Sequence, residues 1–188
     1  WIYILIIQRY KIKMQAQINN SKFYWTLGII VILALSRLIP HPPNFTPILG
    51  MAVFAGAVFD RKMFSFLIPL LSMILSDLFL GFHGSILIIY FAICLNVVIG
   101  IYFISKISYL RICFSLVFGS LVFFIITNFA VWLSSGMYPY SLEGLLACYT
   151  MALPFLQNTI ISTVLYGVGA FFIFELSNKY LVFRPKNF

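Results

Sequence analysis

Long apolar runs separated by short polar segments dominate the chain. Six runs are expected to cross a membrane as helices, because a spanning helix needs about 20 mostly apolar residues. The predicted spans cover residues 24–39, 48–59, 63–81, 86–104, 113–133 and 152–174. In the shortest run, Ala52 and Gly56 share one helix face, which predicts close approach of a neighbouring helix. The pattern predicts an all-α integral membrane protein, a single bundle of six transmembrane helices.

The most distinctive interruption is the proline-rich stretch at residues 37–47, RLIPHPPNFTP. Proline lacks an N–H and fixes φ, and it also biases the preceding residue away from helical geometry. The stretch is therefore expected to be a stiff, extended connector. A longer connector is predicted from Ser134 to about Thr150, and its second half suits a short interfacial helix.

Three segments are expected along the chain: a tail at residues 1–23, the transmembrane domain at 24–175 and a basic tail at 176–188. Residues 1–13 join a short apolar run to basic residues. We favour Met14 as the native start, which leaves 1–13 outside the native protein. An interfacial helix at the N-terminus is the alternative interpretation.

Composition supports the membrane assignment, since 63% of residues are hydrophobic and only 9% are charged. Soluble domains carry about a quarter charged residues. The net charge of +8 lies in short loops and tails, so we interpret it as membrane topology and expect no nucleic-acid partner. Basic residues on one side of the predicted spans are Arg9, Lys11, Lys13, Lys22, Arg61, Lys62, Lys106, Arg111, Lys179, Arg184 and Lys186. The positive-inside rule then puts both termini in the cytoplasm.

Polar residues inside the predicted spans gather at one depth, in the outer half of the bundle. Ionisable groups there cost roughly 2.5–3.5 kcal/mol each on insertion scales, so they usually face the bundle interior or a wet cavity. Arg37 and Asp77 are expected to pair or to share such a pocket. The predicted substrate-binding residues are Arg37, His41, Asn44, Phe45, Asp77, Asn128, Trp132, Tyr149 and Asn158. Structural alternatives are a buried ion pair that locks two helices, interhelical hydrogen bonds, and an aromatic belt.

Signatures of catalysis are missing from the sequence. It has no G-x-x-x-x-G-K-[ST] phosphate loop, no H-E-x-x-H and no G-x-S-x-G. The three cysteines lack metal-ligand spacing, and His41 and His83 fit ordinary loop histidines better than metal ligands. We therefore expect no enzyme activity, no cofactor and no metal site.

Four segments carry a resemblance to a known family: RLIPHPPNFTPILGMAVFAGAVF, PLLSMILSDLFLGFHG, TNFAVWL and ALPFLQNT. They resemble an uncharacterised family of small six-span bacterial membrane proteins, over about residues 24–175. That family is similar to the substrate-binding S components of energy-coupling-factor vitamin transporters. The resemblance implies an S-component-like fold in the bacterial cytoplasmic membrane, a pocket near the outer face, and a coupling membrane subunit with ATPases as partner.

These observations lead to two functional hypotheses. The first is a substrate-binding subunit for uptake of a small solute, a vitamin or micronutrient, in which Arg37 holds an anionic group. The second is a membrane scaffold or assembly protein whose polar residues are structural.

Overall fold

Helices form nearly all of the described chain. The computed structural model describes residues 28–29, 31–59, 62–82 and 84–182. A helical segment at residues 31–38, called here the N-terminal helix, precedes five further helices. These are α2 (Ile48–Val58), α3 (Lys62–Leu80), α4 (Ile86–Phe103), α5 (Tyr109–Ser134) and α6 (Leu142–Val182). The predicted all-α class is confirmed, since the described residues contain no strand.

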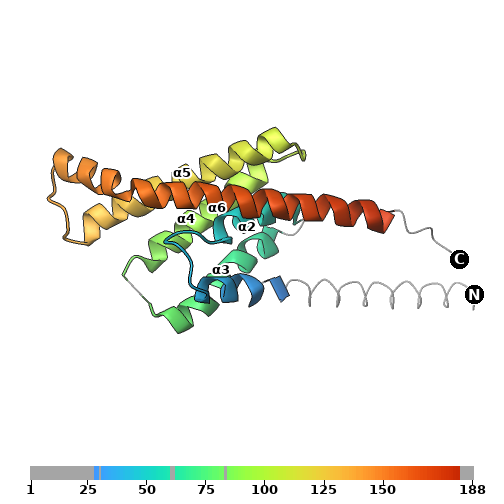
Figure 1. The fold of residues 1–188 in the computed structure, drawn as a ribbon, viewed down its shortest axis with the longest axis horizontal. Helices are drawn as coiled ribbons and strands as arrows, with labels where there is room; N and C mark the ends of the chain where they lie inside the picture. Colours follow the sequence, from blue (N-terminus) through green and yellow to red (C-terminus); the bar gives the residue numbers. More distant parts are fainter. Residues whose placement is uncertain (1–27, 30, 60–61, 83, 183–188) are drawn as a thin grey trace, which may run out of the picture.

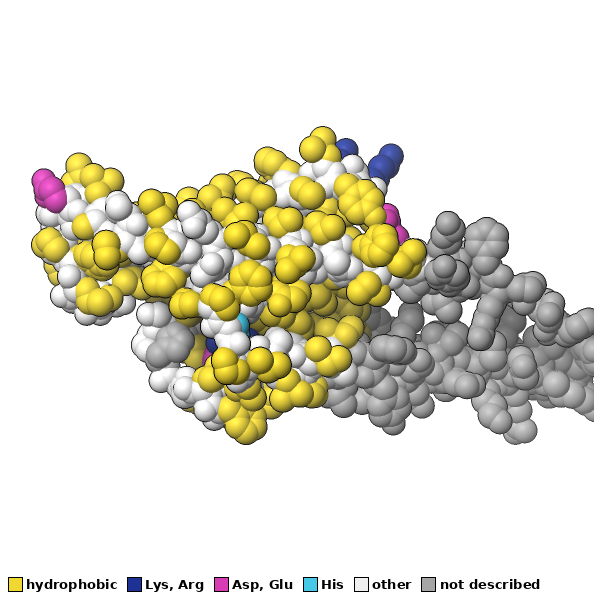
Figure 2. Space-filling model, viewed as in Figure 1, with side chains coloured by type: hydrophobic (Ala, Val, Ile, Leu, Met, Phe, Trp, Pro, Cys, Tyr) yellow, Lys and Arg dark blue, Asp and Glu magenta, His cyan; other side chains and the backbone are white. Residues whose placement is uncertain are grey.

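Four of the helices, α3 to α6, are long and apolar enough to cross a membrane. Their outward surface is also apolar: Leu87, Phe79 and Leu110 are 78%, 73% and 82% exposed. Figure 2 shows hydrophobic side chains covering most of the visible face. A surface of this kind needs a lipid environment. The helices therefore agree with a membrane protein, while the number of six spans and the orientation of the termini stay predictions.

Helix α2 is the centre of the bundle, as Figure 1 shows. It is only 11 residues long, with eight of them buried. A Cβ added to Gly56 would lie 2.1 Å from the carbonyl oxygen of Val97 on α4, and one added to Gly100 would lie 2.1 Å from that of Val53. The close helix approach predicted from Ala52 and Gly56 is therefore confirmed.

The predicted connector between residues 134 and 150 is wrong in its extent. Helix α5 ends at Ser134 and α6 begins at Leu142, so the connection is shorter than expected. Ser141 helps to start α6, because its hydroxyl accepts the backbone N–H of Gly144 at 3.2 Å, and Glu143 lies in the favourable first turn. The predicted interfacial helix is thus the first part of α6, which continues through Pro154.

The length of α2 decides where the proline-rich connector lies. Eleven residues rise about 16 Å, roughly half of the 30 Å hydrocarbon core. Residues 47–50, at the N-terminal end of α2, are buried, so this end lies inside the bundle. In Figure 1 the connector before α2 lies beside the middle of α6, away from both ends of that helix.

Candidate ligand-binding site

The connector is fastened to α6 through its backbone. The Asn158 side chain donates to the carbonyl oxygen of Pro43 at 3.0 Å. The Ser162 hydroxyl lies 3.3 Å from the carbonyl oxygen of Asn44 and shares its single proton with the Thr159 carbonyl at 3.2 Å. Asn44 has φ of 62°, a left-handed conformation that asparagine adopts more readily than most residues. Phe45 packs edge-to-face on Tyr166 of α6, with ring centroids 6.1 Å apart. The connector thus has a fixed shape.

The predicted pairing of Arg37 with Asp77 is confirmed. Arg37 Nη1 lies 2.6 Å from Asp77 Oδ1, and the same nitrogen donates to the Ser76 hydroxyl. The other carboxylate oxygen of Asp77 accepts the Tyr90 hydroxyl at 2.8 Å. The Asp77 side chain is 2% exposed and that of Arg37 is 17% exposed. Both partners stabilise this carboxylate, because a buried charge without partners is costly.

A cavity of about 320 Å³ lies between the connector and the bundle. Its lining residues come from the N-terminal helix, the connector and α2 to α6: Arg37, His41, Asn44, Thr46, Ile48, Leu49, Met73, Leu80, Ile89, Ile93, Phe123, Thr159 and Thr163. The lining is mostly apolar with a few polar groups, and the volume is at the small end of the range for ligand sites. Figure 2 shows charged side chains of both signs and a histidine gathered beneath α6.

Three predicted site residues lie elsewhere, on the hairpin formed by α5 and α6. Asn128 donates to the Phe124 carbonyl of its own helix, and Tyr149 donates to the Ile125 carbonyl at 2.7 Å. The Trp132 indole donates to the Pro139 carbonyl at 3.0 Å. None of the three lines the cavity. They join α5 to α6 and to the connection between them, so their substrate role stays a prediction.

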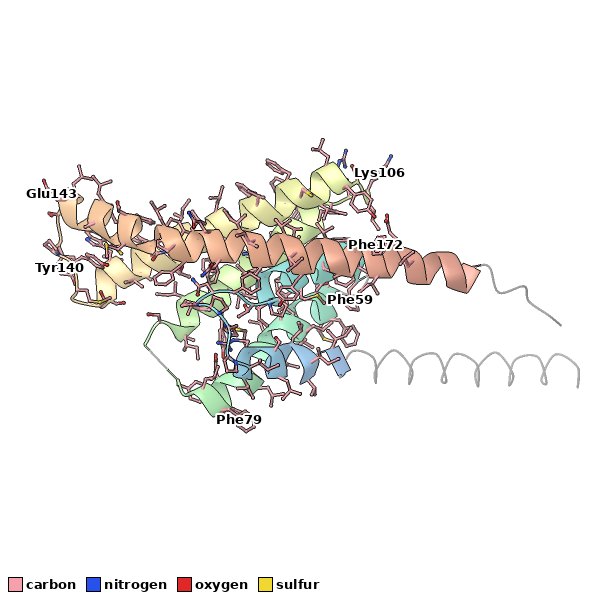
Figure 3. The ribbon with its side chains drawn as sticks, in the orientation of Figure 1. Phe59, Phe79, Lys106, Tyr140, Glu143 and Phe172 are labelled. Carbon is pink, nitrogen blue, oxygen red and sulfur yellow. The ribbon has the colours of Figure 1, made fainter. Side chains whose placement is uncertain are left out.

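The reason for this separation is the length of the hairpin. Figure 1 shows α5 and α6 extending past the ends of α3 and α4, and Figure 3 labels Tyr140 and Glu143 at the tip. The prediction that polar residues share one depth measures each residue from the end of its own span, and it holds only if all spans end at one plane. Because the hairpin extends further, residues near its tip lie beyond the level of Arg37. His83 lies outside the described residues.

Sequence reasoning missed three residues of this region: Tyr90, Thr159 and Thr163. Tyr90 lies 13 residues after Asp77, on another helix, so no local spacing connects them. The two threonines are four residues apart in an apolar run, which places them on one face of α6. That spacing was a usable signal for a polar stripe facing the bundle interior.

The described residues contain no group of three His, Cys, Asp or Glu side chains that could hold a metal ion. The polar groups at the cavity are instead hydrogen-bond donors and acceptors. The arrangement can therefore bind and orient a small molecule through Arg37, the connector and α6.

Comparison with known proteins gives one match. Residues 17–185 match a family of unknown function, DUF6580, and the chain belongs to this family. No curated protein and no solved structure matches the chain. The predicted membership of an uncharacterised family is confirmed, and the similarity to S components of vitamin transporters stays a proposal.

Proposed function

We propose that this member of a family of unknown function is a membrane-embedded substrate-binding subunit for uptake of a small solute, a vitamin or another micronutrient. The observation that carries the proposal is the proline-rich connector, whose non-helical backbone lies against the middle of α6 and walls a cavity. At membrane depth, non-helical backbone occurs only where protein buries it or where it lines a water-filled cavity.

The first of these two explanations does not fit the connector. His41 and Asn44 are exposed at the cavity although α6 holds the backbone beside them. Residues 38–44 of the connector are exposed although the connector lies against α6. Exposed polar groups beside a mostly apolar cavity support a wet, ligand-accessible site.

The proposed orientation follows from charge. The cavity is lined by Leu80 and Ile89, near the end of α3 and the start of α4. Basic Lys62 and Lys106 lie at the opposite ends of these helices, which the positive-inside rule assigns to the cytoplasm. The cavity would then open outward, with both termini inside, as capture of an external solute requires.

Energy for uptake would come from a separate coupling membrane subunit with ATPases, since the chain carries no phosphate loop. The small-residue face of α2 is not free for such a partner. Ala52 is fully buried, and Gly56 faces the Val97 backbone on α4. A coupling subunit would dock on another surface of the bundle.

The proposal is tested by removing the Arg37–Asp77 ion pair, whose arginine lines the cavity. Arg37→Ala alone would leave Asp77 buried without its cation, which costs about 3–5 kcal/mol of stability. A loss of bound solute in that variant could then come from unfolding instead of from the missing guanidinium. The double variant Arg37→Met/Asp77→Leu replaces both groups with apolar side chains, an exchange that is often neutral for stability. We expect this variant to fold but to lose bound solute.

The measurement is mass spectrometry of small molecules released when full-length protein, gently purified from its native membrane, is denatured. Wild type should release one compound well above background, and the double variant should release none. Tyr109→Phe is the control, because it removes a 2.6 Å hydrogen bond to Glu175, far from the cavity. Equal release from wild type and the double variant would contradict the proposal.

The scaffold hypothesis has one observation in its favour. The hydrogen bonds of Asp77, Asn158 and Ser162 all hold helices or the connector together. A purely structural role predicts an empty wild-type cavity, and it predicts that the charge-swapped variant Arg37→Asp/Asp77→Arg regains the stability that each single change removes.

A further inference from the structure

Two threonines of α6 line the cavity, but their hydroxyls differ. The Thr159 hydroxyl donates to the Phe155 carbonyl at 2.7 Å within its own helix. The Thr163 hydroxyl has no hydrogen-bond partner among the described residues, although the residue is fully buried. Buried polar groups in native proteins nearly always have partners. Ser65, Asn96 and Ser115 also carry an unpartnered buried polar atom, but of these four residues only Thr163 lines the cavity, so a molecule bound there can supply its partner.

Arg37 also keeps hydrogen-bonding capacity. All of its recorded bonds, to Met73, Ser76 and Asp77, come from Nη1. The guanidinium carries five N–H donors, and the described residues supply no partner for Nη2 or Nε. The side chain is 17% exposed, and Arg37 lines the cavity. Arg37 can therefore donate to a second molecule while it remains bound to Asp77.

The charge of the site is already balanced. Arg37 and Asp77 neutralise each other at 2.6 Å, and the cavity lining holds no second charged side chain. A ligand carboxylate that formed its own ion pair with Arg37 would separate Arg37 from Asp77. The Asp77 carboxylate, whose side chain is 2% exposed, would then be buried without a cation. If the ion pair stays intact, an anion would bring an uncompensated charge into an apolar site.

The volume of the cavity limits the size of the ligand. A volume of 320 Å³ is roughly twice that of a cavity of about 150 Å³ that binds one benzene ring. Much of the wall is apolar, including Leu49, Ile93 and Phe123. An apolar surface beside two hydrogen-bonding points suits a compact ring compound with polar substituents.

We propose, on the basis of the function proposed above, that the cavity takes a single-ring-sized, uncharged organic molecule. A carbonyl oxygen or ring nitrogen of this molecule accepts from the remaining N–H groups of Arg37, and a second polar atom bonds the Thr163 hydroxyl. Thr163 is thereby a ligand-binding residue, and the expected anionic group at Arg37 is replaced by a neutral hydrogen-bond acceptor.

The test uses the full chain, purified gently from its native membrane, and the compound released on denaturation. Mass spectrometry should identify a molecule that is neutral at pH 7. Thr163→Val keeps the shape of the side chain but removes the hydroxyl, so the amount released should fall about tenfold. The thermal midpoint of unfolding is then compared between Thr163→Val and wild type after the compound has been removed from both. The midpoint of Thr163→Val should not be lower, because the variant loses a buried hydroxyl that has no partner in the empty protein.

Thr127→Val is the matched control, because its hydroxyl donates within α5 to Phe123 at 2.8 Å and Thr127 does not line the cavity. It should release the wild-type amount. A released carboxylate or phosphate compound would overturn the inference while leaving the proposed function intact. Unchanged release from Thr163→Val would show that Thr163 does not bind the ligand. A wild-type protein that releases no compound would contradict both this inference and the proposed function.

Discussion

The Asp77 carboxylate joins three helices. It accepts from Arg37 on the N-terminal helix and from Tyr90 on α4, while it is itself on α3. Hydrogen bonds to a buried charge are stronger than neutral ones, and the loss of one leaves the carboxylate poorly solvated. At the scale of single residues, this carboxylate both stabilises the fold and holds the Arg37 guanidinium at the cavity.

Tyr90→Phe should therefore destabilise the protein by about 1.5–3 kcal/mol, since it removes one donor to a buried carboxylate. Thermal or denaturant unfolding in detergent measures the change. Tyr102→Phe is the control, because Tyr102 is 75% exposed and its hydroxyl loss should have little effect. Equal stability of the two variants would show that the Tyr90 bond contributes nothing.

Sequence predicted the residue-scale site in part. Arg37 and Asp77 could be paired because they were the only opposite charges placed at one depth. Tyr90 could not be identified as a partner of Asp77, because a tyrosine in an apolar run is expected to pack against other apolar side chains. The missing partner of Thr163 is equally invisible in a sequence, because it depends on the positions of residues far along the chain.

Helix α2 is the element that creates the cavity, because it is short, buried and closely packed. Its contact with α4 uses reciprocal glycines, in which each glycine faces a backbone carbonyl of the other helix. Such backbone approach lets a short helix sit in the middle of a bundle. The small residues of α2 were readable in the sequence, whereas its use as the central helix depended on which neighbours it met.

Gly56→Ala and Gly100→Ala should each lower the thermal midpoint, because the new methyl group would lie 2.1 Å from a backbone oxygen and the helices would have to separate. We expect about 1–3 kcal/mol of destabilisation, as for overpacked cores. Gly169→Ala on α6 is the control, since a Cβ there meets nothing within 4 Å. A Gly56→Ala protein as stable as Gly169→Ala would refute the close packing.

The proline-rich connector depends on α6 for its position. Asn158→Ala removes the hydrogen bond to the Pro43 carbonyl and should loosen the connector while the helices remain intact. Hydrogen exchange at the amide of Phe45, which donates to the Pro42 carbonyl at 3.0 Å within the connector, should accelerate in this variant, and exchange in the core of α4 should not change. Uniform acceleration would indicate general unfolding, and no change at the connector would contradict the role of Asn158.

The whole molecule sets an exposed, polar connector against an apolar bundle. Helices α5 and α6 contain 26 and 41 residues, so they rise about 39 Å and about 60 Å and exceed a hydrocarbon core of about 30 Å. They must tilt or protrude. The sequence analysis placed the polar first part of α6 in a connector and began the span at residue 152. Hydropathy indicates which residues suit the membrane, and it does not show how far a helix continues beyond them.

Topology is predicted at this scale from the basic residues. In a variant without Cys94, Cys113 and Cys148, Met137→Cys in the α5–α6 connection, at a side chain that is 68% exposed, should react with a membrane-impermeant thiol reagent added outside intact cells. A cysteine at Lys106, between α4 and α5, should react only after the membrane is opened. The reverse labelling pattern would place the cavity mouth on the cytoplasmic side.

The central claim is that the cavity between the connector and α6 holds a small solute. The most direct measurement is a high-resolution experimental structure of the full chain, purified gently from its native membrane into a lipid nanodisc. We expect density for one compact molecule in contact with Arg37 and within hydrogen-bond distance of the Thr163 hydroxyl. A cavity filled only by water, by a lipid chain or by collapsed side chains would contradict the claim.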